Sequence, residues 1–239
     1  MKIIADTHTH TVASTHAFST LLENVRYAKE AGLCALAITD HAPNIQDAPH
    51  IWHFYNLHVI PRQIDGVYIL RGAEANIGEN GSIDLEEEVL QKLDWVVASF
   101  HTPLPGTPGI EDYTQAYSRL AENPYVDVIG HSGTQKYLYD YRRVIPLFKK
   151  YGKIVEINEG SAFSRPTSRP NCLEIAKLCK EYQVPVVVNS DAHFAMQIGH
   201  YERSLEMLES IGFPEELVLN ADKSRFLEHI RRTKRIDLQ

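Results

Sequence analysis

The sequence is poor in cysteine and has no two cysteines close together. Its three cysteines, Cys34, Cys172 and Cys179, form no C-x-x-C motif, and their odd number does not suit a disulfide framework. Unpaired cysteines of this kind are typical of proteins in a reducing cytosol. We therefore expect a cytoplasmic protein in which these cysteines are small core residues.

The chain also lacks a long hydrophobic run and an excess of positive charge. It begins Met1-Lys2-Ile3-Ile4-Ala5-Asp6, with neither the apolar region of a signal peptide nor a segment able to span a bilayer. The formal net charge of -7 argues against a broad surface for binding nucleic acid or anionic membranes. A phosphorylated ligand is still compatible with this net charge, because bound divalent metals can make the local charge of a binding site positive.

Low-complexity segments, long linkers and sequence repeats are missing as well, so we expect one domain over residues 1–239. What the chain does contain is seven short apolar, β-branched runs: Lys2–Asp6, Ala35–Thr39, Tyr68–Ala73, Trp95–Ser99, Val126–Gly130, Ile154–Ile157 and Val184–Asn189. Successive runs end between 26 residues apart (residue 73 to residue 99) and 34 residues apart (residue 39 to residue 73), about one βα unit each. Runs that are apolar throughout are typical of parallel strands buried on both faces.

The segments between these runs carry helix signals. Thr20-Leu21-Leu22-Glu23 is a capping box, and Gly32 is placed to end the helix that it begins. Further helices are expected at about 84–93, 112–121, 142–151, 171–182, 202–211 and 222–232, the last of them closing the bottom or side of the domain. Alternating strands and helices predict a parallel sheet, which is either an open doubly wound sheet or a closed, slightly distorted barrel.

The stretch Asp6-Thr7-His8-Thr9-His10 follows the first apolar run. Residues two apart on an extended backbone point to the same face, so His8 and His10 project together from the end of that strand. Two neutral imidazoles on one face form half of a metal site.

The ends of the other predicted strands supply the remaining ligands. Six of the seven strand ends carry His, Glu or Asp, which gives nine candidates: His8, His10, His16, His41, Glu74, His101, His131, Asp191 and His193. In a parallel barrel the strand ends meet at one rim, where functional residues gather. Nine ligands exceed the three or four protein ligands of a single zinc ion, so the set predicts two or three metal ions at the rim of a barrel.

These motifs resemble a known family. In order along nearly the whole chain, Asp6-x-His8-x-His10, Thr39-Asp40-His41, His101, His131 and Ser190-Asp191-Ala192-His193 are similar to the motifs of the PHP (polymerase and histidinol phosphatase) superfamily. The segment Gly72-Ala73-Glu74-Ala75-Asn76 and the compact length most resemble the YcdX-type phosphatases within it. The resemblance implies a distorted (βα)7 TIM-like barrel with three divalent ions, usually zinc and sometimes manganese or iron, and a trimer.

Carried over by position, the resemblance assigns each ion its ligands. His8, His10, Glu74 and Asp191 would hold the first ion, and His16, His41 and His193 the second. Glu74, His101 and His131 would hold the third, so that Glu74 bridges two ions.

Such a centre predicts phosphoester hydrolysis. A hydroxide shared between ions is available at neutral pH, and ions about 3.5–4 Å apart stabilise both the attacking and the leaving oxygen of an in-line displacement. The acid for the leaving group is either a metal-bound water or Asp191.

Asp6 and Asp40 stand beside ligands, where they either orient imidazoles or cap strand ends. Arg165, in the loop expected after the sixth strand, is a candidate phosphate contact.

The expected substrate is a small phosphomonoester, with histidinol phosphate as one alternative. Another alternative is a different barrel hydrolase, either an amidohydrolase or a TatD-type nuclease acting on nucleic-acid ends. Amidohydrolases often use a carboxylated lysine at the fourth strand, where this chain has His101, and nuclease action calls for a basic groove. A non-catalytic metal-buffering module is the last alternative, which the complete ligand set does not favour.

Overall fold

The strands of this protein form a barrel-like parallel sheet. The computed structural model describes residues 1–234 and 236, with the backbone alone at 162–164. Within these residues the parallel strands follow one another in the order β1 (Ala5–Thr9), β2 (Ala35–Ile38), β4 (Val67–Asn76), β5 (Trp95–Ser99), β6 (Val128–Ile129), β7 (Ile154–Asn158) and β8 (Val186–Asn189). A short strand, β3 (Gln63–Ile64), pairs antiparallel with the start of β4 and was not expected from the sequence.

The two edge strands of this sheet meet and nearly close it. The backbone N–H and the hydroxyl of Thr7 in β1 donate to Asn189 Oδ1 at the end of β8, at 2.9 and 2.8 Å. Just beyond, the His10 N–H donates to the Ala192 carbonyl at 2.9 Å. The fold is therefore the expected distorted (βα)7 barrel rather than an open doubly wound sheet.

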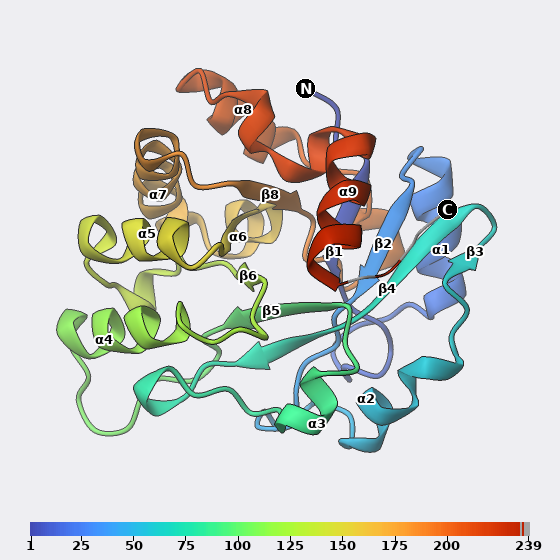
Figure 1. Ribbon diagram of the computed structural model, residues 1–239, viewed down its shortest axis with the longest axis horizontal. Coiled ribbons are helices and arrows are strands. Elements are labelled where there is room, and N and C mark those ends of the chain that lie inside the picture. The colour runs from blue at the N-terminus through green and yellow to red at the C-terminus, as the bar shows by residue number, and fades with distance from the viewer. Residues whose placement is uncertain (235, 237–239) are drawn as a thin grey trace.

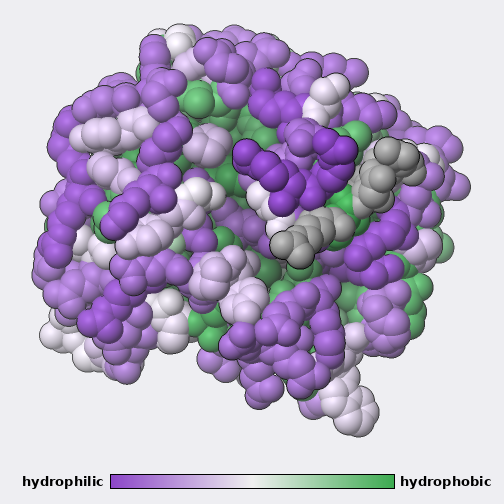
Figure 2. Space-filling model, viewed as in Figure 1, coloured by the Kyte–Doolittle hydropathy of each residue, from purple (hydrophilic) through white to green (hydrophobic). Residues whose placement is uncertain are grey.

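Helices surround the barrel, as Figure 1 shows for α4, α5, α7 and α8. Their bounds are α1 (Leu21–Glu30), α2 (Trp52–Asn56), α3 (Glu87–Leu90), α4 (Ile110–Leu120), α5 (Tyr141–Lys150), α6 (Glu159–Ser164), α7 (Arg169–Tyr182), α8 (Glu202–Ser210) and α9 (Lys223–Lys234). The outer surface seen from the same side is largely hydrophilic (Figure 2). Among the described residues, no helix combines the length and the apolar character needed to cross a bilayer.

The barrel interior is filled with small and branched side chains. Ala5, Ala35, Val97 and other residues near the strand starts form one buried cluster with Phe226 and Ile230 of α9, both fully buried. Helix α9 therefore covers the N-terminal end of the barrel, the first of the two positions expected for the last helix, and crosses in front of β1 in Figure 1. Closing one end with apolar residues leaves the other end for polar groups.

Strand β4 is longer than expected because it changes partner halfway. Its first half, residues 68–71, pairs with β2, and its second half, residues 72–76, pairs with β5. At the crossing point, a Cβ on Gly72 would lie 2.5 Å from the Trp95 carbonyl oxygen, so only glycine fits. The extended β4 carries Glu74 to the centre of the rim.

Other boundaries also differ from the predictions. Strand β1 begins at Ala5 and runs to Thr9, so His8 lies inside the strand rather than after it. Helix α3 begins at Glu87, because the carboxylate of Asp84 instead accepts from the Asn76 and Asn44 N–H groups at 2.7 and 2.8 Å. The segment after β7 was expected to be a loop, but it contains α6. Residues 235 and 237–239 of the expected domain lie outside the described residues.

Candidate metal centre

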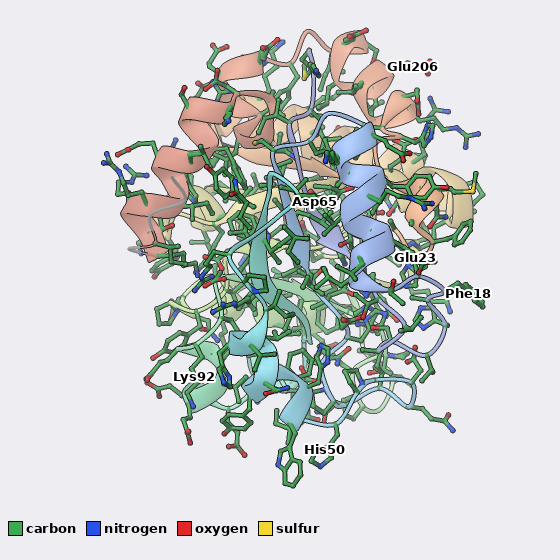
Figure 3. The ribbon with its side chains drawn as sticks, turned by 90° about the vertical axis from the view of Figure 1, so that its right-hand side faces the viewer. Phe18, Glu23, His50, Asp65, Lys92 and Glu206 are labelled. Atoms are coloured by element: carbon green, nitrogen blue, oxygen red, sulfur yellow. The ribbon has the colours of Figure 1, made fainter. Side chains whose placement is uncertain are left out.

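The structure brings all nine candidates together at the C-terminal rim. Seven of them line a cavity of about 740 Å³: His16, His41, Glu74, His101, His131, Asp191 and His193. His8 and His10 lie beside them and are fully buried. His50, by contrast, is exposed on the segment before α2, where its side chain points outward (Figure 3).

Glu74 occupies the middle of this cluster, and its two oxygens face different groups of histidines. Oε1 lies 3.0 Å from His131 Nε2 and 3.2 Å from His101 Nε2. Oε2 lies 2.9 Å from His41 Nδ1 and 3.3 Å from His8 Nε2. This two-sided placement is what a carboxylate shared between two ions requires.

Asp191 faces the pair of histidines on β1. Its Oδ1 lies 3.2 Å from His10 Nε2 and 3.5 Å from His8 Nε2. The backbone of Asp191 is in the left-handed region, with φ of 57°, and its N–H donates to the His8 carbonyl at 3.1 Å. An unusual backbone conformation therefore turns this carboxylate into the cavity.

His16 lies on the exposed side of the centre. Its ring stands 4.4 Å from that of His193 and 5.1 Å from that of His41, measured between ring centroids. His16 Nδ1 contacts the carboxylate of Asp47, in the loop after β2. No spacing in the sequence pointed to Asp47.

Several buried polar atoms in the cluster have no hydrogen-bond partner. Among the described residues they include His8 Nε2, His10 Nε2, His41 Nδ1, Glu74 Oε2 and His193 Nε2. Leaving such atoms unpaired costs free energy, whereas a divalent cation among them would satisfy several at once. Mixed imidazole and carboxylate donors suit zinc, manganese or iron.

The side chains that could share one ion fall into overlapping groups. In each group the candidate ligand atoms lie within 4.8 Å of one another, and the groups are His8–His10–Asp191, His10–His41–His193, His16–His41–Asp47 and His41–Glu74–His101. The first group matches the ligands expected for the first ion, with Glu74 beside it. The other groups differ from the expected sets: His10 joins His41 and His193, Asp47 joins His16 and His41, and His41 joins Glu74 and His101.

The charges of the centre favour bound cations. Burial opposes ionisation of Glu74, but the neighbouring His101 and His8 hold the pKa of its carboxyl well below the usual value. The pKa of Asp191 is also held well below its usual value, against burial, by His8. Burial lowers the pKa of His10 to about 3, so this imidazole is neutral and can act as a ligand.

Of the two aspartates expected either to orient imidazoles or to cap strand ends, Asp40 reaches the candidate ligand His10 indirectly. Its Oδ1 accepts from Ser14 Oγ at 2.8 Å, and that hydroxyl lies 3.5 Å from His10 Nδ1. Asp6 instead accepts from the Tyr201 hydroxyl at 2.9 Å and the Ser190 N–H at 3.3 Å. Asp6 therefore connects β1 to the segments before and after Asp191, which favours the structural one of the two roles expected for it.

The side chains that do orient imidazoles directly were missed from the sequence. Glu156 Oε1 lies 2.7 Å from His8 Nδ1, and Asn76 Oδ1 lies 2.6 Å from His101 Nδ1. The only sequence signal for Glu156 was a carboxylate inside an otherwise apolar run.

Arg165 lines the cavity just after α6. Its Nη2 lies 3.2 Å from Asp191 Oδ2, and its side chain is 28% exposed. Among the described residues lining the cavity, it is the only arginine or lysine. Its guanidinium therefore lies beside the candidate ligand Asp191.

A family model and two similar proteins both relate this chain to phosphatases of the PHP domain family. The family model for the PHP domain matches residues 6–160. A probable phosphatase of Clostridium novyi is 45% identical over 235 residues, covering 97% of this chain and 96% of that protein. A probable phosphatase of Caldanaerobacter subterraneus is 45% identical over 238 residues, covering 98% of this chain and 94% of that protein.

Solved structures share the fold at low sequence identity. The histidinol phosphate phosphatase of Lactococcus lactis, in complex with zinc, L-histidinol and phosphate, matches with a TM-score of 0.65 and 17% identity, over 90% of this chain and 95% of that one. A Listeria monocytogenes protein assigned as a histidinol phosphatase matches with a TM-score of 0.62 and 19% identity, over 84% of this chain and 99% of that one.

Proposed function

Because the chain belongs to the PHP domain family and is a metal-dependent phosphatase, we propose that it hydrolyses small phosphomonoesters at a centre of three divalent ions. His8, His10, Glu74 and Asp191 would hold the first ion. His16, His41 and His193 would hold the second, and Glu74, His101 and His131 the third. We propose zinc as the metal, with manganese or iron as alternatives.

The observation that carries this proposal is the position of Glu74 between two groups of histidines. Each of its oxygens has imidazole nitrogens within 3.3 Å. Divalent ions held there would acidify a bound water and stabilise charge on the phosphoryl oxygens. No Ser or Cys nucleophile is needed for this chemistry.

The chain's own side chains would bind and orient the substrate. The guanidinium of Arg165 can donate two parallel hydrogen bonds to phosphate oxygens. The remaining lining includes Ile45, Met196 and Gln197, which suit the body of a small ester. A cavity of this size and a net charge of -7 support small monoesters over nucleic-acid ends.

Metal analysis together with a substrate panel tests the proposal. Protein purified without chelator should contain about three equivalents of divalent metal and should release phosphate from a generic phosphomonoester. The panel should include phosphodiesters and histidinol phosphate, since the Lactococcus lactis neighbour binds histidinol and phosphate. One equivalent of metal or less in folded protein, or no turnover of any ester, would contradict the proposal.

Replacing Arg165 by Met should weaken phosphate binding. Losing a charge-assisted pair should raise KM for a phosphomonoester, and the inhibition constant of inorganic phosphate, by about tenfold to a hundredfold. Arg169→Met is the matched control, because Arg169 is an exposed arginine at the start of α7 that does not line the cavity. Equal phosphate affinity in the two variants would show that Arg165 does not bind the phosphate group.

We also propose a reducing, cytoplasmic location, because Cys34, Cys172 and Cys179 are all free. The whole chain is proposed to act as one metallohydrolase unit, and the trimer stays a prediction.

A further inference from the structure

Glu156 is a fully buried carboxylate inside β7 that accepts four hydrogen bonds. Oε1 accepts from His8 Nδ1 at 2.7 Å and from Asn189 Nδ2 at 2.9 Å. Oε2 accepts from the His131 N–H at 2.8 Å and from Asn158 Nδ2 at 3.0 Å. The catalytic proposal above uses none of these contacts.

The other contacts of Asn158 and Asn189 show which of their atoms donate hydrogen bonds to Glu156. Asn158 Oδ1 accepts from the Ser161 N–H at 2.7 Å, so its amide nitrogen must face Glu156. Asn189 Oδ1 accepts from the Thr7 N–H at 2.9 Å, which orients its amide in the same way. With every other neighbour a donor, the carboxylate is ionised and His8 Nδ1 must also donate. When a metal ion is bound, His8 would then direct the lone pair of Nε2 to the side that faces Glu74 and Asp191.

The same carboxylate reaches two further candidate ligands. Its bond to the His131 N–H holds a backbone with φ of 23°, which directs the imidazole of His131 toward Glu74. Asn158 Nδ2, bound to Glu156, also lies 3.2 Å from Asp191 Oδ2. Glu156 therefore contacts His8, His131 and, through Asn158, Asp191.

We propose that Glu156 is a positioning residue that fixes the ligands of the first and third ions and leaves the second ion independent. This inference rests on the metal centre proposed above. His8 and Asp191 belong to the first set and His131 to the third. Among the described residues, the partners of the Glu156 carboxylate are His8, Asn189, His131 and Asn158, and none of them belongs to the second set, His16, His41 and His193.

An amide cannot replace this carboxylate. The side chain of Gln has one acceptor oxygen, so its NH2 group must face either His8 and Asn189 or His131 and Asn158, and all of these are donors. In the first arrangement the amide would drive His8 to the tautomer with the proton on Nε2, which blocks the metal-facing atom. In the second it would face the N–H of His131.

Metal retention in Glu156→Gln tests the proposal. Asp127→Asn is the matched control. Asp127 is also a little-exposed carboxylate, and it accepts a hydrogen bond from the Val96 N–H at 2.8 Å. Unlike Glu156, it lies just before β6, at the start of that strand rather than at the rim. During dialysis against a graded series of a weak chelator, Glu156→Gln should lose the first and third ions at a chelator concentration about tenfold to a hundredfold lower than the wild type does, and should retain the second ion normally. Asp127→Asn should retain metal like the wild type even if its Tm falls.

Equal metal retention in Glu156→Gln and Asp127→Asn would overturn the inference while leaving the proposed centre intact. Wild-type protein without bound metal would contradict both this inference and the proposed metal centre. If Glu156→Gln does not fold, nitrogen-15 NMR of the zinc-loaded wild type still decides, because His8 should carry its proton on Nδ1. A proton on Nε2 of His8 would overturn the inference.

Discussion

Glu74→Gln is expected to abolish turnover and to lower metal occupancy at two of the three positions, with the barrel still folded. The amide nitrogen of Gln is not a ligand, and the lost charge is the one that faces His41 and His8 on one side and His101 and His131 on the other. The backbone contacts of this position do not depend on the side chain, since the Glu74 N–H donates to the Asp40 carbonyl at 3.1 Å. Metal content, circular dichroism and phosphatase rate measure the three expected effects.

His16→Ala provides the comparison for Glu74→Gln. The side chain of His16 is 53% exposed and belongs to a single expected ion, so its loss should remove about one equivalent of metal and reduce turnover less. Full metal content and near-normal activity in Glu74→Gln would show that the carboxylate is not shared between ions. Equal metal loss in the two variants would point the same way.

Asp191→Asn should have the second largest effect. It removes the carboxylate that faces His10 and His8, so we expect loss of the first ion and a fall in kcat beyond the roughly hundredfold typical of losing a group that only supports a ligand. Asn is the suitable replacement because it tolerates the left-handed backbone, with φ of 57°, that position 191 adopts. The fold should therefore survive, and metal content and kcat should fall together.

Asp47→Asn is the matched control for Asp191→Asn. Asp47 is also a carboxylate in contact with a candidate ligand, His16, but it lies outside the ligand set that the resemblance implies. We expect this variant to keep about three equivalents of metal, with at most a weaker hold on the second ion. A full set of metals in Asp191→Asn, or a greater loss in Asp47→Asn, would mean that the ligands of the first and second ions have been assigned wrongly.

The sequence by itself determined where the strands of the sheet lie along the chain, that they run parallel, and which residues gather at the rim. Apolar runs about one βα unit apart predict parallel strands, and the carboxyl ends of parallel strands meet at one edge whatever the details of packing. Residues one or two positions after those runs, such as His101, His131 and Asp191, could therefore be placed together without a structure. The sequence placed the terminal helix only at the bottom or side of the domain, and the packing of Phe226 and Ile230 in the structure puts it at the N-terminal end of the barrel.

Only the tertiary structure decided which side chains hold those ligands in place. Glu156 meets His8 across 148 residues of sequence, from the interior of a strand whose pattern indicated burial alone. The partner change of β4 at Gly72 is equally invisible in sequence, because it depends on how closely two neighbouring strands approach. Local spacing fixes which residues reach a strand end, whereas hydrogen bonds between distant strands depend on register and closure, which the whole barrel sets.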